Sequence, residues 1–496
     1  MEWPSRNRRG CYTLIDMTER EFIESTTSEN KCWFWLEGSS IGNGICIERV
    51  SKYVYEEGWD DDDDPVSGDV MLPDAIDGCP IIEIGEDAFH YGLVIKSLRL
   101  PDGIQIVRKY GMGERNFVIH SMPSQLRIAE EGSFLGMTIM SDTFPQSIEE
   151  IGDYAFYGCA GLKKLYLCEG LFMLGDEAFS NCPDLIQVSL PATLTLVGNR
   201  VFSGCSRLKS AHLHEGMEML GDEMFRDCRN LECVSLPASL SVVGEGIFSG
   251  CIKLCNIGLP EDSKVLSLTE NALIRNEDQT LIAWTSIDDS GVLRVPDGIR
   301  RIGAYTFLNR TDITSVVFPD SVVEIGQGGF KGCSSLREIT FGSGLVCIEA
   351  DAFKDCTLLT DIRLPDSVVE IGQGGFKGCS SLREIVFGSS LVYIKAEAFK
   401  NCTLLTDIRL PDSVVEIGQG GFKGCSSLQN VSVSQEIQHI DTAAFYGCAL
   451  SDFVIRGDAP RFRSIKELVD GLERCSAEIY AMVTNTKYRF INQDEP

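Results

Sequence analysis

The hydrophobic positions of this chain recur every 23 residues, and a phenylalanine marks one of them in almost every period. Two uninterrupted series carry the pattern: Phe156, Phe179, Phe202, Phe225 and Phe248, and then Phe307, Phe330, Phe353, Phe376, Phe399, Phe422 and Phe445. Phe89, Met112 and Phe134 extend the first series upstream, with steps of 23, 22 and 22 to Phe156. A fixed period over about fifteen units indicates a repeat architecture.

One unit predicts two short strands joined by turns. Leu359, Ile362 and Leu364 alternate with polar residues near the end of the unit, which is the pattern of a half-buried strand. Pro365 ends this strand, because proline has no amide hydrogen for a ladder, and residues 368–371 form a second extended piece. Glycines then turn the chain, and a phenylalanine and a cysteine follow at the three-residue spacing of one 3₁₀ or helical turn.

No such coil can bury its apolar side alone, so the coils must stack on one another. We therefore predict a β-rich solenoid, a right-handed superhelix of coils of about 23 residues with short 3₁₀ or α turns. Residues 463–474 show helical spacing of apolar residues and predict a C-terminal capping helix. Such a cap would cover the open strand edges at the end of the array.

Eleven of the twenty cysteines stand three residues after the phenylalanine. They are Cys159, Cys182, Cys205, Cys228, Cys251, Cys333, Cys356, Cys379, Cys402, Cys425 and Cys448. Stacking would gather them into an internal column, where a free cysteine behaves as a small hydrophobic residue. We expect packing; disulfides between neighbouring coils and metal binding are the alternatives. No C-x₂-C pair supports a zinc site.

The repeat resembles the BspA-like, or type 5, leucine-rich repeats. The pattern I-G-x-x-x-F-x-x-C-x-x-L-x-x-I-x-L-P carries the resemblance, with Ile151, Phe156, Cys159, Leu162 and Leu165 as one example. The resemblance covers roughly residues 68–456. It implies a solenoid whose surface serves adhesion or protein binding.

The spacing from Phe248 to Phe307 is 59 residues, which is one period plus 36, and the inserted segment looks like the hairpin that interrupts many members of this family. The predicted organisation is an N-terminal β-rich cap region at 1–67, repeat array 1 at 68–262, a β-hairpin insert at 263–295, repeat array 2 at 296–456 and a C-terminal cap at 457–496. Residues 319–364 and 365–410 are nearly identical 46-residue double units that differ at six positions.

The charge of the chain excludes some classes of partner. A net charge of −29, from 73 acidic and 44 basic residues, repels nucleic acid and anionic membrane surfaces. No apolar stretch of about 18 residues predicts a membrane span. No apolar run of signal-peptide length follows Met1, so we expect a cytoplasmic protein, with the cell surface or secretion as the alternative.

Catalytic motifs are missing from the sequence. It holds five histidines and no G-x-S-x-G, P-loop or H-E-x-x-H motif, so we expect no catalytic residue, no cofactor and no metal. His212 and His214 alternate on one predicted strand and share a face. We expect an exposed pair, with metal binding as the alternative. The five aspartates at 60–64 predict a solvated loop, or else a weak cation site.

The outward side chains of the L-x-x-I-x-L strands form the candidate binding face. In the first array they are mostly neutral, whereas in the second array Glu coils alternate with Asp and Arg coils. The candidate residues for a protein partner are Lys164, Tyr166, Gln187, His212, Glu338, Asp361, Arg363, Glu384, Asp407 and Arg409. Either these side chains only pair with side chains of neighbouring coils and have a structural role, or they form a regularly spaced surface that binds a partner. Tyr166 is the first to test, since interface anchors are often aromatic.

The sequence therefore favours a non-enzymatic protein-binding or scaffold module. The second hypothesis is a cell-surface adhesin or host-interaction factor that is exported without a recognisable signal peptide. A purely structural spacer and an enzyme are the remaining hypotheses, and the enzyme would need a deep polar pocket near Trp284.

Overall fold

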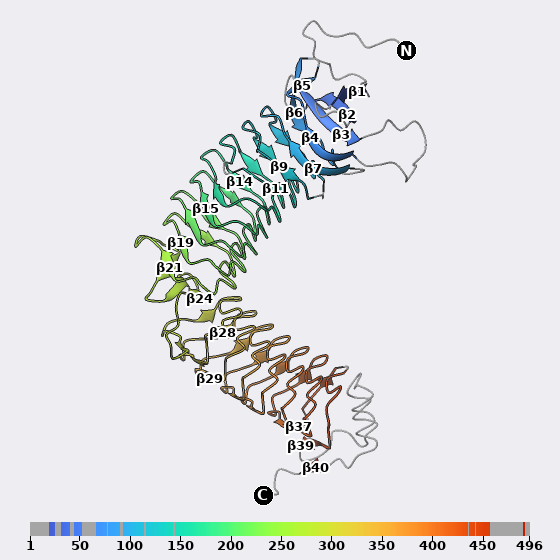
Figure 1. The fold of residues 1–496 in the computed structure, drawn as a ribbon. Coiled ribbons are helices and arrows are strands. Elements are labelled where there is room, and N and C mark those ends of the chain that lie inside the picture. Colours follow the sequence, from blue (N-terminus) through green and yellow to red (C-terminus); the bar gives the residue numbers. More distant parts are fainter. Residues whose placement is uncertain are drawn as a thin grey trace, which may run out of the picture. The chain divides into compact units, whose positions relative to one another are not determined.

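The structure is a computed structural model that describes residues 19–24, 31–39, 44–51, 66–76, 78–89, 93–113, 116–141, 144–434, 436–441, 443–456 and 490–491. The described part is a β-solenoid of about 16 turns with coils of about 23 residues, and it contains no helix (Figure 1). The predicted solenoid is thus confirmed, whereas the capping helix predicted at 463–474 lies outside the described residues. The chain divides into two compact units, Met1–Val265 and Leu266–Pro496.

The first unit is built on two parallel ladders. We call the ladder of the L-x-x-I-x-L strands the leucine ladder. Its members are β4 (Val66–Met71), β7 (Leu93–Arg99), β9 (Val118–Ile119), β11 (Thr138–Ile139), β13 (Lys164–Tyr166), β15 (Gln187–Leu190), β17 (Ser210–Leu213), β19 (Cys233–Ser235) and β21 (Asn256–Gly258). A single bridge from Thr138 to Ala160 lies between β11 and β13.

The other ladder consists of strands that end, in most coils, just before a glycine, and we call it the glycine ladder. In the first unit it comprises β3 (Ile45–Ser51), β6 (Cys79–Ile84), β8 (Ile106–Val107), β10 (Ile128–Ala129), β12 (Glu150–Ile151), β14 (Met173–Leu174), β16 (Leu196–Val197), β18 (Met219–Leu220) and β20 (Val242–Val243). Antiparallel strands β1 (Glu19–Glu24) and β2 (Lys31–Gly38) precede β3, and β5 (Ala75–Ile76) pairs with β6.

The second unit repeats this plan. Its glycine ladder begins with the antiparallel strands β22 (Leu266–Leu268), β23 (Ala272–Arg275) and β24 (Thr280–Trp284), within the predicted insert. It continues in parallel through β26 (Arg301–Ile302), β28 (Glu324–Ile325), β30 (Cys347–Ile348), β32 (Glu370–Ile371), β34 (Tyr393–Ile394), β36 (Glu416–Ile417) and β38 (His439–Ile440). Its leucine ladder comprises β25 (Val292–Arg294), β27 (Ser315–Val317), β29 (Glu338–Thr340), β31 (Asp361–Arg363), β33 (Glu384–Val386), β35 (Asp407–Arg409), β37 (Asn430–Ser434), β39 (Asp452–Arg456) and β40 (Phe490–Ile491).

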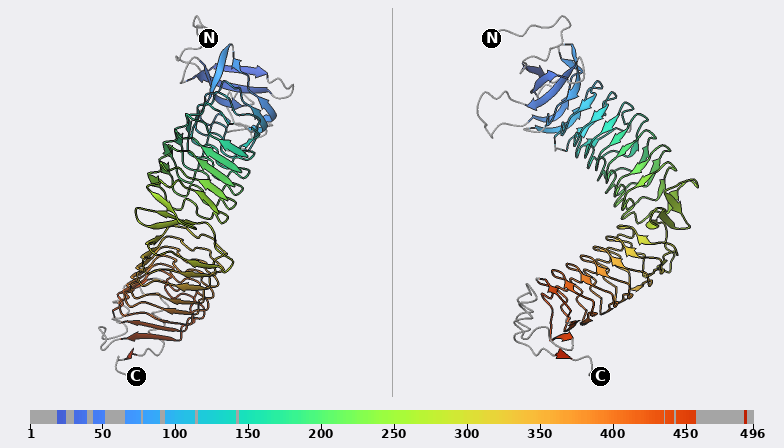
Figure 2. Two further views of the ribbon diagram at one scale, coloured as in Figure 1. Left: turned by 90° about the vertical axis from the view of Figure 1, so that its left-hand side faces the viewer. Right: turned by 180° about the vertical axis from the view of Figure 1, so that it is seen from behind.

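Both units therefore begin with an antiparallel sheet whose last strand becomes the first strand of the glycine ladder: β3 pairs in parallel with β6, and β24 with β26. The successive coils of each unit then lie one on another in Figure 2. The antiparallel strands give the first coil of each ladder hydrogen-bond partners, which an open edge would lack.

The core of each unit is a file of stacked phenylalanine rings. In the first unit the rings of Phe134, Phe156, Phe179 and Phe202 follow one another with centroid distances of 5.0, 5.0 and 5.8 Å and nearly parallel planes. These side chains are fully buried. The second unit has the same file from Phe307 to Phe445, with distances of 4.7–5.4 Å. Phe156, Phe179 and Phe202 therefore lie in one interior file, as the predicted stacking of the coils requires.

The cysteine column packs beside this file as free thiols, as predicted; ten of the eleven are buried, and Cys448 is partly exposed. Each thiol donates to the phenylalanine carbonyl of the preceding coil, as Cys182 does to Phe156 at 3.3 Å and Cys205 to Phe179 at 3.1 Å. An alanine or valine of similar size could not supply this donor. Burial raises the pKa of the Cys159 thiol to about 12, so this thiol stays protonated and uncharged.

The segments that were expected to form 3₁₀ or α turns adopt a different structure. The turn after the glycine is closed by a hydrogen bond from the Cys159 amide to the Phe156 carbonyl at 3.3 Å, which has the expected three-residue spacing. However, two residues of each turn adopt a left-handed backbone, such as Glu177 with φ of 53° and Asn181 with φ of 57°. Left-handed residues interrupt a right-handed helix, so the segment remains a series of turns.

Over residues 181–250 and 309–424, the second of these left-handed positions alternates between Asn or Asp and glycine in successive coils. It is Asn181, Gly204, Asp227 and Gly250 in the first unit. A Cβ atom on Gly204 would clash with Oδ1 of Asn181, so each long side chain lies over the glycine of the next coil. The alternation recurs at Asn309, Gly332, Asp355, Gly378, Asn401 and Gly424. In these two segments the structural period is two coils, which matches the 46-residue double unit.

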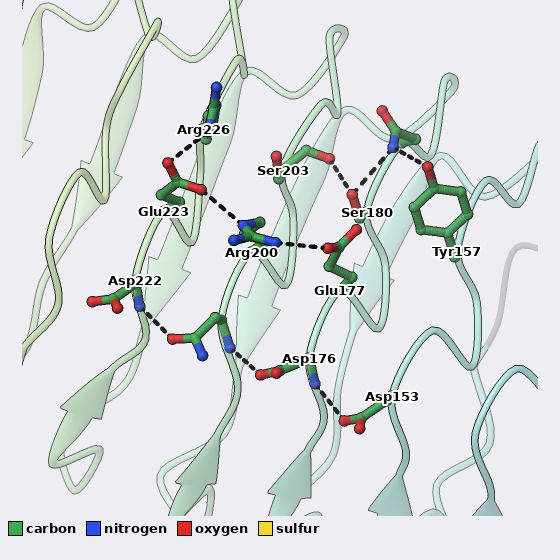
Figure 3. Close-up of polar contacts among 12 residues, drawn as sticks. Asp153, Tyr157, Asp176, Glu177, Ser180, Arg200, Ser203, Asp222, Glu223 and Arg226 are labelled. Carbon is green, nitrogen blue, oxygen red and sulfur yellow. Dashed lines mark hydrogen bonds and ion pairs between the residues drawn. The ribbon is translucent and has the colours of Figure 1, made fainter. Parts of the chain in front are cut away.

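A ladder of side-chain oxygens ties the turns of the first unit together (Figure 3). Asp153 accepts a hydrogen bond from the amide of Asp176 at 2.7 Å, and Asp176 accepts one from the amide of Asn199 at 2.6 Å. Asn199 does the same for Asp222 at 2.8 Å. Each bond satisfies a backbone amide at the surface that the two strand ladders leave free.

Ion pairs between coils lie next to this ladder. Arg200 contacts Glu177 at 3.1 Å and Glu223 at 2.8 Å, which Figure 3 shows as a chain across three coils. Partly exposed pairs of this kind stabilise a protein by about 0–1 kcal/mol each. They neutralise charge on the turn side rather than hold the array together.

Glu397 is the strongest example in the second unit. Lys377 of the preceding coil and Lys400 of its own coil both contact this carboxylate at 2.7 Å. Their hydrogen bonds lower its pKa to about 2. The stability that this group contributes is therefore present above pH of about 4 and is lost as the pH falls through 2.

Replacing one ring of the phenylalanine file tests its energetic weight. We expect Phe202→Ala to lower the free energy of unfolding by about 3–5 kcal/mol, because it leaves a cavity and removes two stacked contacts. Phe172→Ala, at a side chain that is 38% exposed, is the matched control and should cost about 1 kcal/mol or less. Urea unfolding followed by circular dichroism measures both changes, and equal losses would contradict the buried file.

Candidate functional site

The leucine ladder of the first unit presents two files of outward side chains. The pairing register of β13 to β21 aligns Lys164, Gln187, Ser210, Cys233 and Asn256 in one file, and Tyr166, Ser189, His212, Ser235 and Gly258 in the other. The residues between the files are buried. The candidate residues Lys164, Tyr166, Gln187 and His212 therefore lie on one face, and Tyr166 is 46% exposed.

The leucine ladder of the second unit carries the charged candidates. Glu338, Asp361, Glu384 and Asp407 stand at one outward position of successive coils, and Arg363 and Arg409 stand at the other. All six side chains are exposed. The ten candidates thus fall on two surfaces, one on each unit.

Few ion pairs neutralise the charged candidate residues on the leucine ladder of the second unit. Among the candidate residues the one ion pair joins Arg363 and Glu384 at 3.8 Å, and the two side chains are 77% and 59% exposed. Such a pair contributes little to stability. Hydrogen bonds from Thr406 and Asn430 lower the pKa of Asp407. The alternative is that these side chains only pair with one another across the coils. It explains one weak ion pair of this surface, the contact between Arg363 and Glu384.

A groove of about 570 Å³ opens where β15 to β21 end. Its lining comprises Glu169, Ala192, His212, Leu213, His214, Glu215, Ser235, Leu236, Gly258, Leu259 and Pro260. The rings of His212 and His214 lie 4.5 Å apart, centroid to centroid, at 85°. Nδ1 of His214 lies 2.6 Å from the carbonyl oxygen of Leu190.

Sequence reasoning placed the two histidines on one face but missed the groove. Two signals could have revealed it. In the file that contains Tyr166 and His212, the two coils after His212 carry Ser235 and Gly258, so there is little side-chain volume at these positions. In addition, His214 stands where the neighbouring coils have Pro191 and Pro237, so an imidazole takes the place of the proline that normally follows the strand.

Sequence reasoning also missed an apolar strip on the glycine ladder of the first unit. The outward residues Met173 and Leu196 are aligned by pairing, as are Met219 and Val242. Leu196 is 55% exposed, and Phe172 flanks Met173. The signal was present in the sequence as apolar residues at positions that other coils fill with Glu or Arg.

Several kinds of site are missing from the part of the chain that the structure describes. It contains no group of three or more His, Cys, Asp or Glu side chains placed to hold a metal ion. The described residues also form no helix long and apolar enough to cross a membrane. Trp284 donates its indole N–H to the carbonyl of Ser286 at 2.6 Å.

The geometry agrees with a comparison against known repeat families. The model of the BspA type leucine-rich repeat region matches residues 82–206, 173–287, 300–404 and 346–466 in six copies. The chain belongs to this family. Repeat proteins of this type are generally not catalytic. No curated protein matches the sequence.

Solved structures share the fold. A leucine-rich cell surface protein from Faecalibacterium prausnitzii is 23% identical, with 83% of this chain and 95% of that chain covered and a TM-score of 0.54. The pneumococcal vaccine antigen PcpA is 16% identical, with 96% and 99% covered and a TM-score of 0.50. At these identities the similarity establishes the solenoid fold.

Arginine replacements test whether the charged surface has a structural role. We expect the double variant Arg363→Ala and Arg409→Ala to change the free energy of unfolding by about 0.5 kcal/mol or less, because both side chains are exposed. Arg310→Ala is the contrasting control. Arg310 is 7% exposed and bonds to Asp312 and to the carbonyl of Trp284. Its loss should cost about 3 kcal/mol or more. A large loss in the double variant, measured by urea unfolding, would make this surface structural.

Proposed function

We propose that the chain is a non-enzymatic protein-binding or scaffold module and that the outward face of its leucine ladders receives the partner. The support is geometric. Each strand of a leucine ladder has two outward positions, and these positions repeat in successive coils. A partner therefore meets side chains at a constant spacing of about 4.8 Å. A regular surface of this kind suits an extended contact better than a single pocket.

The observation that carries the proposal is the charge of the second unit. Four acidic residues in one file and two arginines in the other are exposed, with one weak ion pair among them. Exposed charges in fixed register favour electrostatic complementarity, which governs the specificity and the rate of association. A partner would therefore present an alternating pattern of cationic and anionic groups to this surface.

The first unit adds an aromatic anchor. Tyr166 stands at the start of its file, with Lys164 beside it on the same strand and the small side chain of Ser189 next to it in the following coil. Exposed tyrosines of this kind are frequent hot spots of interfaces, because a large rigid ring is buried at low entropic cost.

The alternative function is a cell-surface adhesin or host-interaction factor. One solved structure with this fold is a cell surface protein, and another is a vaccine antigen. We propose a cytoplasmic location for this chain. Fractionation of the native cells against marker proteins separates the two functions, because a protein found only inside the cell cannot act as an adhesin.

A pull-down from native lysate tests the proposed face. The full chain is the bait, and the variant combines Tyr166→Ala, Arg363→Ala and Arg409→Ala. We expect the partners retained by the unmodified chain to fall by about tenfold, since each interface anchor is worth 1 kcal/mol or more. Quantitative mass spectrometry of the eluates measures the change.

The matched control changes the same residue types away from the two files: Tyr446→Ala, Arg207→Ala and Arg229→Ala. Tyr446 is 54% exposed, and the two arginines are exposed as well. The control variant should retain its partners. If both variants lose them equally, or if neither does, the leucine-ladder face is not the binding surface.

A further inference from the structure

The two imidazoles of the groove have the separation of a metal-binding pair. Their ring centroids are 4.5 Å apart. Two imidazoles on one ion, with metal–nitrogen bonds of about 2.1 Å and an angle of about 90–110° between them, have centroids roughly 4.5–5.2 Å apart. His212 lies on β17, and His214 follows directly after the last residue of that strand; both side chains are exposed and line the groove.

His214 is held in the tautomer that a metal ligand requires. A carbonyl oxygen only accepts hydrogen bonds, so the 2.6 Å contact with Leu190 places the proton on Nδ1 of His214. Nε2 then carries the lone pair. Metal-binding histidines commonly donate their other ring N–H to a backbone carbonyl in this way, which fixes the ring and raises the basicity of the ligand.

His212 can adjust to share the same ion. Its side chain is exposed, and the structure gives its ring no hydrogen bond to any described residue. Rotation about the bond to an imidazole ring is broad and costs little. The ring of His212 can therefore turn its lone pair toward Nε2 of His214 without disturbing the strand.

The groove favours a cation. Glu169 and Glu215 line it together with the two histidines. Both carboxylates accept hydrogen bonds from backbone amides of the next coil, Glu169 from Ala192 and Glu215 from Ala238. Two acidic side chains beside the histidines raise the local concentration of cations.

We propose that His212 and His214 bind a divalent transition-metal ion in this groove, with water in the remaining coordination positions. The described residues offer no third side chain close enough to complete the site. The groove volume of about 570 Å³ leaves room for those waters. Imidazole ligands select Ni²⁺, Cu²⁺ and Zn²⁺ over Ca²⁺ and Mg²⁺. The site needs no protein partner, so it is independent of the proposed function.

Titration of the full chain with Ni²⁺ by isothermal calorimetry tests the site, in a non-chelating buffer with the thiols kept reduced. We expect the variants His212→Ala and His214→Ala each to lose one equivalent of Ni²⁺ or to bind it at least about tenfold more weakly, which is the loss that even an outer-shell partner causes. Ca²⁺ should give no such equivalent.

Two controls locate the ion. His439→Ala changes a partly exposed histidine on β38 and should leave the equivalent intact. Cys233→Ser with Cys255→Ser removes the more accessible thiols near the groove and should also leave it intact. Circular dichroism checks that each variant is folded.

Three results would overturn the proposal. The first is an unchanged Ni²⁺ equivalent in the double variant His212→Ala and His214→Ala. The second is loss of the equivalent in the cysteine variant, which would assign the ion to the thiols. Equal binding of Ca²⁺ at the same stoichiometry would assign the ion to the carboxylates of Glu169 and Glu215 in place of the two histidines.

Discussion

Every feature of this chain depends on one constraint: a coil of about 23 residues can bury its apolar side only against the coils before and after it. Three interactions meet that constraint at once. Phenylalanine rings stack at 5.0–5.8 Å in the first unit. Two ladders of backbone hydrogen bonds join the strands, and column thiols donate to the phenylalanine carbonyls of the preceding coil. All three require neighbouring coils to be in the same register.

Register also determines what the surface can do. Because each outward position repeats in every coil, a substitution in one coil changes one point of a file, and a run of substitutions changes the character of a whole strip. The charged files of the second unit and the apolar strip of the first unit are such runs. The groove is the opposite case, because it is a local interruption of the repeat. His214 stands where neighbouring coils have a proline, and Gly258 stands at an outward position that has a side chain in the preceding coils.

The period, the two strands of each coil and the interior positions of Phe156 and Cys159 could be predicted from the sequence, because hydrophobic spacing reports burial directly. The turns could not. Residues such as Glu177 and Arg200 adopt positive φ, although their side chains do not favour it, because contacts with adjacent coils select that backbone. The groove was missed as well, because it results from small residues in two neighbouring coils, Ser235 and Gly258, together with His214 in place of a proline, rather than from any one motif.

Deleting whole coils is the most direct test of stacking in register. Removal of residues 365–410 joins Leu364 to Pro411 and excises two complete coils, which also preserves the alternation of Asp or Asn with glycine. We predict that this variant still unfolds cooperatively, with a thermal midpoint close to that of the full chain. Removal of residues 365–399 excises one and a half coils and should abolish the cooperative transition of the second unit. Equal damage by both deletions in a calorimetric scan would contradict the stacked solenoid.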